Sequence, residues 1–554
     1  SMKYYPKMTN IGKASNGVGI GELYKVDSHQ LDALLTYQET FAKIHNFKAV
    51  AGSTYTQYME EGLGMKATDF SNDNLSYNNF GAAAKRERLN SYKVRATTLS
   101  FFSRLEYVLN DRYILNTTVR ADGASHFGDG NKWGYFPSFS AAWQLGEEEF
   151  MGFIRPLFSS LKLRGNWGVS GNSRFPLYQS RTKFGFQYVY LGGTDNVIGM
   201  YPNIPGNKML KWETTKQFDL GVDFSLLDNR FEVNFDYYIK TTDDLINPIK
   251  ISAANNGFVE VTGNNGTIRN NGFELFIKSN NLKSKDFAWT TTLNFAKNKN
   301  IVVKLNNGEP RYETIRPHGY YDIQEYMLLQ EGQSLSSIYG YVFDGIIQQG
   351  EPYPMQPNAV PGEPKFKDLD GDSIITPKDR TVIGDGNPDI IIGIGNNLKL
   401  KDFDFSFFFD ASIGAELLNI TRIVMEDQTL VKHAMDRWTL ANPSNTIPRY
   451  GYVRDAGLKY GSYINSQFVE KADYLRLANI ELGYTLPVNK MEKFNKYVKS
   501  LRLFVGGQNL LLLTPYTGLD PEVSTNDGVS YMQGLDYNSY PSFKSVNLGI
   551  KVTF

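Results

Sequence analysis

Apolar and polar residues alternate with a period of two over most of this chain of 554 residues. Between Gln217 and Leu226, for example, phenylalanine, leucine and valine occupy the even positions, and charged, polar or small residues occupy the odd ones. Successive side chains of a β-strand point to opposite faces, so this period predicts strands with one apolar and one polar face. The alternation recurs at Phe231–Ile239, Trp289–Phe295 and Phe403–Phe409. The chain is therefore predicted to be all-β.

The alternating runs predict fifteen strands, and short turns and long loops alternate between them. The predicted strands are residues 29–44, 45–60, 91–110, 111–122, 135–147, 160–171, 210–226, 229–244, 266–279, 286–303, 388–400, 402–415, 474–486, 498–512 and 543–554. The long loops are predicted near residues 61–90, 172–209, 304–387, 416–473 and 513–542. Outer-membrane barrels sort their connections in this way, with short turns at the periplasmic rim and longer loops outside the cell.

Two architectures could accommodate strands with one apolar face. A soluble β-sandwich buries the apolar face in a shared core, whereas a membrane barrel turns it to lipid and lines its lumen with the polar face. The mean hydropathy of −0.37 and the short apolar runs exclude helical spans, which need about 20 apolar residues. The 36 Phe and 35 Tyr are a heavy aromatic load for so polar a chain. Together with the sorted loops, they favour a transmembrane antiparallel β-barrel.

Charge and cysteine content exclude several classes of protein. The 58 basic residues balance 58 acidic ones, so the excess of positive charge that a general nucleic-acid binder needs is missing. The chain has no Cys, which excludes disulfides, thiolate metal sites and cysteine nucleophiles. The five His are scattered without ligand spacing, and no residue set has the spacing of a catalytic site. We therefore predict that the chain is not an enzyme and has no catalytic residues.

The end of the chain is also typical of a barrel. The last predicted strand carries an apolar residue at every even position from Val546 to Val552 and ends at Phe554. Fifteen strands are an odd number, however, whereas bacterial single-chain barrels have an even number. With short turns in the periplasm, residues 1–28 would also lie outside the cell. We expect residues 1–554 to be the C-terminal part of one larger barrel.

Several segments add a family likeness to this pattern. From about Leu105 to Phe554 the chain resembles the SusC/RagA family of TonB-dependent outer-membrane transporters of Bacteroidetes. The segments that carry the likeness, in the family's order, are Arg120–Phe127 (RADGASHF), Trp133–Ser138 (WGYFPS), Leu161–Asn172 (LKLRGNWGVSGN), Leu210–Thr215 (LKWETT), Gly340–Gly345 (GYVFDG), Lys367–Asp372 (KDLDGD), Tyr474–Leu477 (YLRL) and Asp520–Val523 (DPEV).

The resemblance implies a barrel of 22 strands, of which this chain would supply about the last fifteen. The plug, the TonB-contacting segment and about seven N-terminal strands would be absent. It also implies a place in the outer membrane of a Gram-negative bacterium, a SusD-like surface lipoprotein as partner, and TonB-driven import of oligosaccharides or peptides. The alternative is an outer-membrane barrel that binds or adheres without transport. In either case the expected partners include membrane lipid and exclude nucleic acid.

An Asp-rich segment is the candidate metal site. Asp368, Asp370, Asp372 and Asp379 occupy positions 1, 3, 5 and 12 of a calcium loop, and the carbonyl of Ile374 would be the ligand at position 7. Two departures weaken the match, because position 6 is Ser373 instead of Gly and position 12 is Asp instead of Glu. The alternatives are a structural calcium that pins a long loop and an Asp-rich turn without metal.

Aromatic residues of two long loops are the candidate substrate-binding residues, since aromatic rings can stack on sugar rings. The alternative is that they pack the loops together or belong to the aromatic girdle at the membrane interface. Trp133, Tyr135 and Phe136 are expected to anchor a strand at the outer interface. The candidates themselves are Phe186, Tyr188 and Tyr190 in the 172–209 loop, and Tyr531, Tyr537 and Tyr540 in the last loop.

Overall fold

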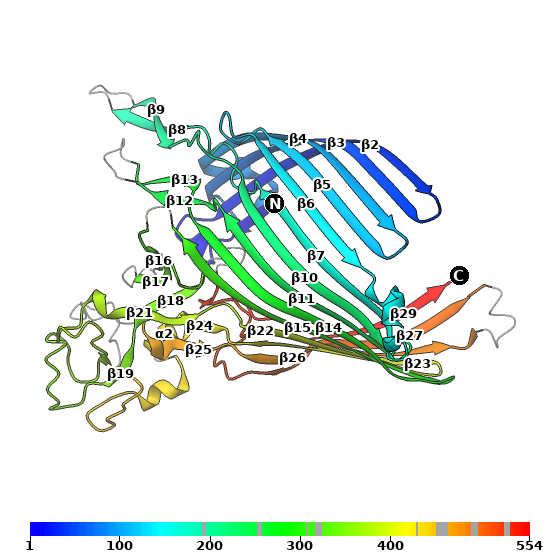
Figure 1. Cartoon of the computed structure of the whole chain (residues 1–554). Coiled ribbons are helices and arrows are strands. Elements are labelled where there is room, and N and C mark those ends of the chain that lie inside the picture. Colours follow the sequence, from blue (N-terminus) through cyan, green and yellow to red (C-terminus); the bar gives the residue numbers. More distant parts are fainter. Residues whose placement is uncertain are drawn as a thin grey trace. The chain divides into compact units, whose positions relative to one another are not determined.

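The chain forms two compact units, both built largely of strands (Figure 1). The computed structural model describes residues 1–190, 196–251, 258–305, 308–315, 324–427, 430–449, 464–488, 497–525 and 532–554. The first unit contains residues 1–140, 168–215 and 244–265, and the second contains residues 141–167, 216–243 and 266–554.

Sixteen strands belong to one sheet, in the order β1-β2-β3-β4-β5-β6-β7-β10-β11-β14-β15-β22-β23-β26-β27-β29. They are β1 (Met2–Tyr5), β2 (Val18–Phe41), β3 (His45–Phe70), β4 (Ala83–Leu109), β5 (Tyr113–Ala124), β6 (Trp133–Trp143), β7 (Phe158–Asn172), β10 (Glu213–Leu226), β11 (Phe231–Asp243), β14 (Thr267–Lys283), β15 (Phe287–Lys304), β22 (Ile390–Leu400), β23 (Phe403–Ile413), β26 (Tyr474–Leu486), β27 (Ser500–Leu513) and β29 (Ser545–Thr553). All fifteen predicted strands are present, and the all-β prediction is confirmed. The sixteenth, β1, pairs with the start of β2, which makes the number of strands even.

The remaining elements lie in the connections between these strands. Small sheets pair β8 (Lys183–Tyr190) with β9 (Asn196–Ile204), β12 (Ile246–Lys250) with β13 (Glu260–Asn264), and β19 (Phe343–Ile346) with β20 (Pro364–Phe366). A four-stranded sheet contains β16 (Arg311–Ile315), β17 (Gln324–Leu329), β18 (Ser337–Tyr341) and β21 (Arg380–Asp385). A three-stranded sheet contains β25 (Val469–Lys471), β24 (Glu416–Asn419) and β28 (Leu535–Asp536). The helices are α1 (Asn10–Lys13) and α2 (Ile420–Asp427), with 3₁₀ turns at Ser76–Asn78, Phe80–Ala82, Leu145–Glu147, Glu149–Ile154, Pro377–Asp379, Lys432–Asp436 and Ser466–Phe468.

Short and long connections alternate along most of the sheet, as predicted; the exception is that the connection 125–132 is shorter than the connection 144–157. The tightest turns are residues 42–44, 110–112, 227–230, 284–286 and 401–402. In the turn between β10 and β11, three successive non-glycine residues, Leu227, Asp228 and Asn229, have φ of 52°, 56° and 62°. Asp and Asn tolerate this left-handed region better than most residues, which suits them to a tight hairpin. The longest connections are residues 173–212, 305–389, 414–473 and 514–544.

The first unit has an apolar band on one face of β2 to β5. Residues 31–41, 45–55, 99–109 and 113–123 lie in register across the four strands. Their odd-numbered side chains share this face and are mostly Leu, Val, Ala, Phe and Tyr, whereas the even-numbered ones include the ion pairs Arg104–Glu106 and Arg120–Asp122. Each segment has eleven residues, the upper end of the roughly 9–11 that a strand needs to cross a bilayer. We call these odd-numbered side chains the apolar band.

Strands β2, β3 and β4 continue well beyond the apolar band, with 24, 26 and 27 residues. The predicted loop near residues 61–90 is therefore wrong over most of its length, since residues 61–70 belong to β3 and residues 83–90 to β4. In residues 61–70 and 83–90 both faces of the strands carry polar side chains, so the alternation that predicts a strand disappears. The backbone pairing of β3 with β4 nevertheless continues. Ion pairs between neighbouring strands, Glu61–Lys93 and Lys66–Glu87, accompany it. We call this part of β2 to β4 the strand extension.

Within the described residues, the helices are all too short or too polar for a membrane span.

Candidate functional site

Three long connections of the second unit, residues 305–389, 414–473 and 514–544, pack together on one apolar core. We call the described parts of these three connections the loop cap. Strand β24 lies between β25, its antiparallel partner, and β28, its parallel partner, so the second and third connections share a small sheet. The core side chains come from all three connections: Tyr326, Met327, Ile338, Leu418, Ile420, Ile423, Val424, Ile464, Phe468 and Leu535. Because none of the three connections could bury this surface alone, each depends on the other two.

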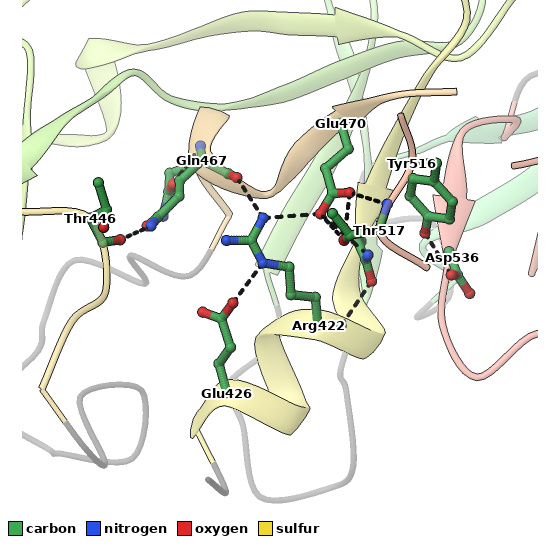
Figure 2. Close-up of polar contacts among 10 residues, drawn as sticks. Arg422, Glu426, Thr446, Gln467, Glu470, Tyr516, Thr517 and Asp536 are labelled. Atoms are coloured by element: carbon green, nitrogen blue, oxygen red, sulfur yellow. Dashed lines mark hydrogen bonds and ion pairs between the residues drawn. The ribbon is translucent and has the colours of Figure 1, made fainter. Parts of the chain in front are cut away.

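An ion-pair network centred on Arg422 joins α2 to the rest of the cap (Figure 2). Asn419 caps the start of α2, because its side-chain oxygen accepts the N–H of Arg422 at 2.8 Å. Arg422 Nε donates to Glu426 at 2.6 Å, and Nη1 donates to Glu470 of β25 at 3.0 Å. Glu470 also accepts the N–H of Thr517 at 2.9 Å. Burial disfavours the charged guanidinium, but the two carboxylates outweigh it and raise the pKa of Arg422 above its ordinary value.

A second set of polar contacts orders the third connection and joins it to α2. Within the connection, Tyr516 donates its hydroxyl to Asp536 Oδ2 at 2.6 Å, as Figure 2 shows. Burial and this hydrogen bond raise the pKa of Tyr516 above its ordinary value, so the phenol stays a donor. Thr421 accepts the N–H of Asn538 at 2.7 Å. These contacts fix the position of the turn that follows β28.

The cap contains two adjoining cavities. The larger, of about 1100 Å³, lies between α2 and the third connection, with Thr421, Leu519 and Val523 among its lining residues. The smaller, of about 480 Å³, also contacts Val523 and is lined by Tyr537. Tyr540 lines both and is 89% exposed. Apolar walls, aromatic rings and hydroxyl or amide groups together suit a ligand such as a sugar or a peptide.

A buried ion pair anchors the third connection to the sheet. Arg476 of β26 contacts Asp520 at 3.2 Å and also pairs with Glu522, while Tyr474 donates its hydroxyl to Glu522 at 2.6 Å. Although burial opposes ionisation, hydrogen bonds from Ser542 and from the N–H of Glu522 hold the pKa of Asp520 below its usual value. Two segments of the family likeness, YLRL and DPEV, therefore meet in one anchor.

The Asp-rich segment forms a compact loop. Ligand oxygens of Asp368, Asp370 and Asp372 lie within 4.8 Å of one another. Ser373 has a φ of 64°, so the residue that replaces Gly adopts the left-handed turn. Its N–H donates to Asp368 at 2.8 Å.

Asp379 is not one of the three converging carboxylates, although its side chain interacts with that of Asp368, and it is fully buried. It accepts the N–H of Leu369 at 2.8 Å and of Thr376 at 2.7 Å, and it closes the capping box of the 3₁₀ turn Pro377–Asp379. Burial opposes its ionisation, but these backbone N–H groups hold the pKa of Asp379 below its usual value. The side chain of Ile374 is exposed, and only its carbonyl was predicted to bind metal.

The predicted aromatic residues are divided between the two units, and the structure describes the side chains of Phe186, Tyr537 and Tyr540. Phe186 is 72% exposed on β8 of the first unit. Tyr188 and Tyr190 lie on the same strand, with side chains outside the described part of the structure, and Tyr531 lies wholly outside it. Tyr537 and Tyr540 of the second unit line the cap cavities, as described above. Spacing along the chain could not reveal the contribution of α2 to the larger cavity, because α2 is about 120 residues from Tyr540 in sequence.

The first unit has an aromatic core built from four of the segments that carry the family likeness. Its members are Ala124, Phe127, Phe136, Leu210 and Trp212, with Val169 packed against them. Trp133 and Tyr135 are 44% and 69% exposed, but Phe136 is only 7% exposed. The expectation that Phe136 anchors the strand at the outer interface is therefore wrong. Even-numbered positions of β6 face away from Trp133 and Tyr135, which places Phe136 in this core.

Comparison with known proteins decides the family. The family model "TonB dependent receptor-like, beta-barrel" matches residues 6–330. The chain belongs to this family. Proteins of the family are outer-membrane receptors and transporters of Gram-negative bacteria, and they are not enzymes. The predicted all-β fold is therefore the barrel fold of this family.

Individual relatives match over nearly the whole chain. TonB-dependent receptor P3 of Formosa agariphila is 34% identical over 563 residues, covering 100% of this chain and 55% of the relative. TonB-dependent receptor SusC of Bacteroides thetaiotaomicron is 30% identical, covering 85% of this chain and 45% of SusC. The RagAB peptide transporter structure has a similar fold, with a TM-score of 0.79 and 22% identity over 97% of this chain and 56% of that one. The chain thus spans about half the length of the curated relatives it matches.

Proposed function

We propose that this chain is part of an energised outer-membrane importer of oligosaccharides or peptides that works with a SusD-like surface lipoprotein. The observation that carries the proposal is its identity of 34% and 30% with receptor P3 and SusC over almost all of its length. The cap supports it, because its three long connections share one core and two of them line a cavity with the exposed Tyr540. In this proposal the long connections lie outside the cell, the apolar band faces lipid, and plug and TonB contact come from a part of the protein beyond this chain.

Uptake tests the proposal directly. A strain lacking the gene should fail to accumulate labelled oligosaccharides or peptides that the parent strain imports, and dissipating the proton gradient should abolish accumulation in the parent. Replacing both Tyr537 and Tyr540 by Ala should reduce uptake at unchanged surface amount, while Tyr77→Ala in the first unit serves as the control. Binding that is independent of the gradient would instead support the alternative of a non-transporting binding or adhesion barrel.

Topology and partner can be tested in the same strain. A tag inserted near residue 350 should be labelled from outside intact cells, and one near Asp228 should not. Mild-detergent purification should recover a lipid-modified surface protein together with this one. The reverse labelling pattern would contradict the orientation, and recovery without any lipoprotein would contradict the proposed partner.

We further propose that the Asp-rich loop binds one calcium ion with a structural role. The three converging carboxylates of Asp368, Asp370 and Asp372 support this, since Ca²⁺ prefers carboxylate and carbonyl oxygens. The carbonyl of Ile374 would supply a further ligand. Asp379, whose carboxylate is engaged with backbone N–H groups, would fix the loop and offer its remaining lone pairs.

Terbium luminescence on the intact protein tests the calcium site. Terbium should bind and be displaced by calcium, and Asp370→Asn should reduce affinity at least tenfold, because it removes one charged ligand. Asp344→Asn, which replaces an exposed acid outside the cluster, is the matched control. Equal signals from the two variants would favour the alternative of an Asp-rich turn without metal.

A further inference from the structure

A small pocket in the first unit carries positive charge that nothing in the proposed function uses. Its volume is about 280 Å³, and its lining residues are Arg95, Thr97, Ser125, His126, Tyr178, Ser180 and Arg181. Two guanidinium groups and four hydroxyl groups therefore surround it, and none of its described lining residues is acidic.

The pocket lies just beyond the apolar band. Arg95 and Thr97 have the same parity on β4 as Leu99 and Phe101, which belong to the band, so all four point to the same face. The contact of Arg95 with Gln57 on β3 agrees, because Arg95 Nη2 donates to the side-chain oxygen of Gln57 at 2.8 Å.

Aromatic side chains mark this edge of the band. Trp133 stacks on Phe101 with ring centroids 6.2 Å apart, and Tyr55 donates its hydroxyl to Gln57 at 3.3 Å. Tyr135, which has the same parity on β6 as Trp133, is 69% exposed. In membrane barrels, aromatic girdles lie at the level of the lipid headgroups. The pocket is therefore at headgroup level when the band faces lipid.

Among the described residues, neither Arg95 nor Arg181 forms an ion pair, and the guanidinium of Arg181 makes no hydrogen bond. The acidic residue Asp129 interacts electrostatically with Arg181, but its ion pair is with Lys132. Other basic groups nearby are paired: Lys93 with Glu61, and Lys132 with Asp129 at 2.8 Å. Burial lowers the pKa of His126, so the two arginines carry the charge of the pocket.

The walls of the pocket are held in place. Tyr178 has a φ of 65°, a backbone conformation that is rare for an aromatic residue. Its hydroxyl accepts the N–H of Arg95 at 2.9 Å, and its carbonyl accepts the N–H of Arg181 at 3.1 Å. Ser125 accepts the N–H of Thr97 at 2.9 Å, which leaves its own O–H available as a donor. Both arginines are therefore attached to a preformed frame.

We propose that this pocket binds the phosphate group of a membrane lipid headgroup. A guanidinium offers a planar fork of N–H donors that matches the oxygens of a phosphate. The hydroxyls of Thr97 and Ser125 add further donors, whereas those of Tyr178 and Ser180 already donate to backbone carbonyls. Basic pockets at the membrane surface recognise phosphorylated headgroups through the same chemistry. The proposal rests on the band facing lipid and not on the imported cargo, so it can fail while the transport proposal stands, and the reverse.

Lipid retention by the intact protein tests the proposal. Protein in nanodiscs of phosphatidylcholine with a minor fraction of phosphatidic acid is transferred to detergent, and bound lipid is measured by native mass spectrometry. The wild type should retain phosphatidic acid, and the double substitution Arg95→Gln with Arg181→Gln should weaken retention at least tenfold. Arg174→Gln is the matched control, because Arg174 is an exposed arginine of the same connection outside the pocket. Heat-modifiable migration checks that each variant is folded.

Each outcome decides the proposal. Loss of phosphatidic acid only from the double variant supports it. Equal retention by the double variant and the Arg174→Gln control overturns it, as does the absence of retention by the wild type. Inorganic phosphate separates a headgroup from a free anion: if millimolar phosphate binds to the wild type and the lipid does not, the site takes a dissolved phosphate and the lipid assignment is wrong.

Discussion

The strand extension and the loop cap are two solutions to the same problem, which is how to fold chain that continues beyond the apolar part of a barrel strand. In the extension, β3 and β4 continue to pair, and exposed ion pairs such as Glu61–Lys93 link the two strands. In the cap, the strands stop and the connections build a core, with Leu418 fully buried and Arg422 held between two carboxylates.

The two regions differ in which contacts contribute to their free energy of unfolding. Exposed ion pairs contribute about 0–1 kcal/mol each, so the extension owes its order chiefly to backbone pairing that continues from the band. The cap instead depends on a few buried contacts, and disrupting any one of them by truncating a side chain costs several times more. A ligand-binding surface supported by such a core keeps its shape, whereas an extended ladder can bend without losing contacts.

The largest expected effect is the loss of Arg422. Arg422→Ala leaves Glu426, whose side chain is 3% exposed, and Glu470, at 10%, buried without their guanidinium. Removing one partner of a buried ion pair costs about 3–5 kcal/mol. Hydrogen exchange of the α2 amides should report a local stability lower by that amount. Arg104→Ala, which removes an exposed ion pair of β4, is the control and should change little. Equal effects of the two substitutions would remove the distinction between cap and extension.

Truncation of the cap core should have the next largest effect. Leu418→Ala removes a fully buried side chain from β24, and such changes cost about 2–5 kcal/mol through lost burial and the cavity left behind. Leu63→Ala in the strand extension is the matched control, because Leu63 is 37% exposed and its loss should cost at most about 1–2 kcal/mol. Protease sensitivity of the three cap connections should rise together in Leu418→Ala. Cleavage confined to one connection would show that they do not share a core.

The contrast between the two regions also explains what could be predicted from sequence. The alternation of apolar and polar residues in a strand is a local pattern, and all fifteen strands predicted from it are present. Residues 18–28, 61–70 and 83–90 of the strand extension were missed because polar residues on both faces erase the period, and β1 was missed because four residues are too few to show one.

The loop cap could not be predicted, since its contacts are not local. Arg422 and Glu470 are 48 positions apart, and Phe468 and Leu535 come from different connections. Of the candidate sites, the Asp-rich loop was recognisable because its acidic groups are close in sequence. The pocket lined by Arg95 and Arg181 was not recognisable, because these two residues meet only after the chain has passed through β5, β6 and β7.

The smallest effect is expected in the strand extension, and it tests the comparison with the loop cap. Lys93→Gln removes the exposed pair with Glu61, whose partners are 61% and 43% exposed, so the cost should stay below about 1 kcal/mol. The loss should shrink further near 1 M salt, where the Debye length falls to about 3 Å, because exposed charges are then screened. The loss in Arg422→Ala should survive the same salt, since buried charges are screened much less. Thermal unfolding in detergent at low and high salt, with both variants side by side, measures this. A salt-resistant loss of several kcal/mol in Lys93→Gln would mean that the extension, too, is held by buried contacts.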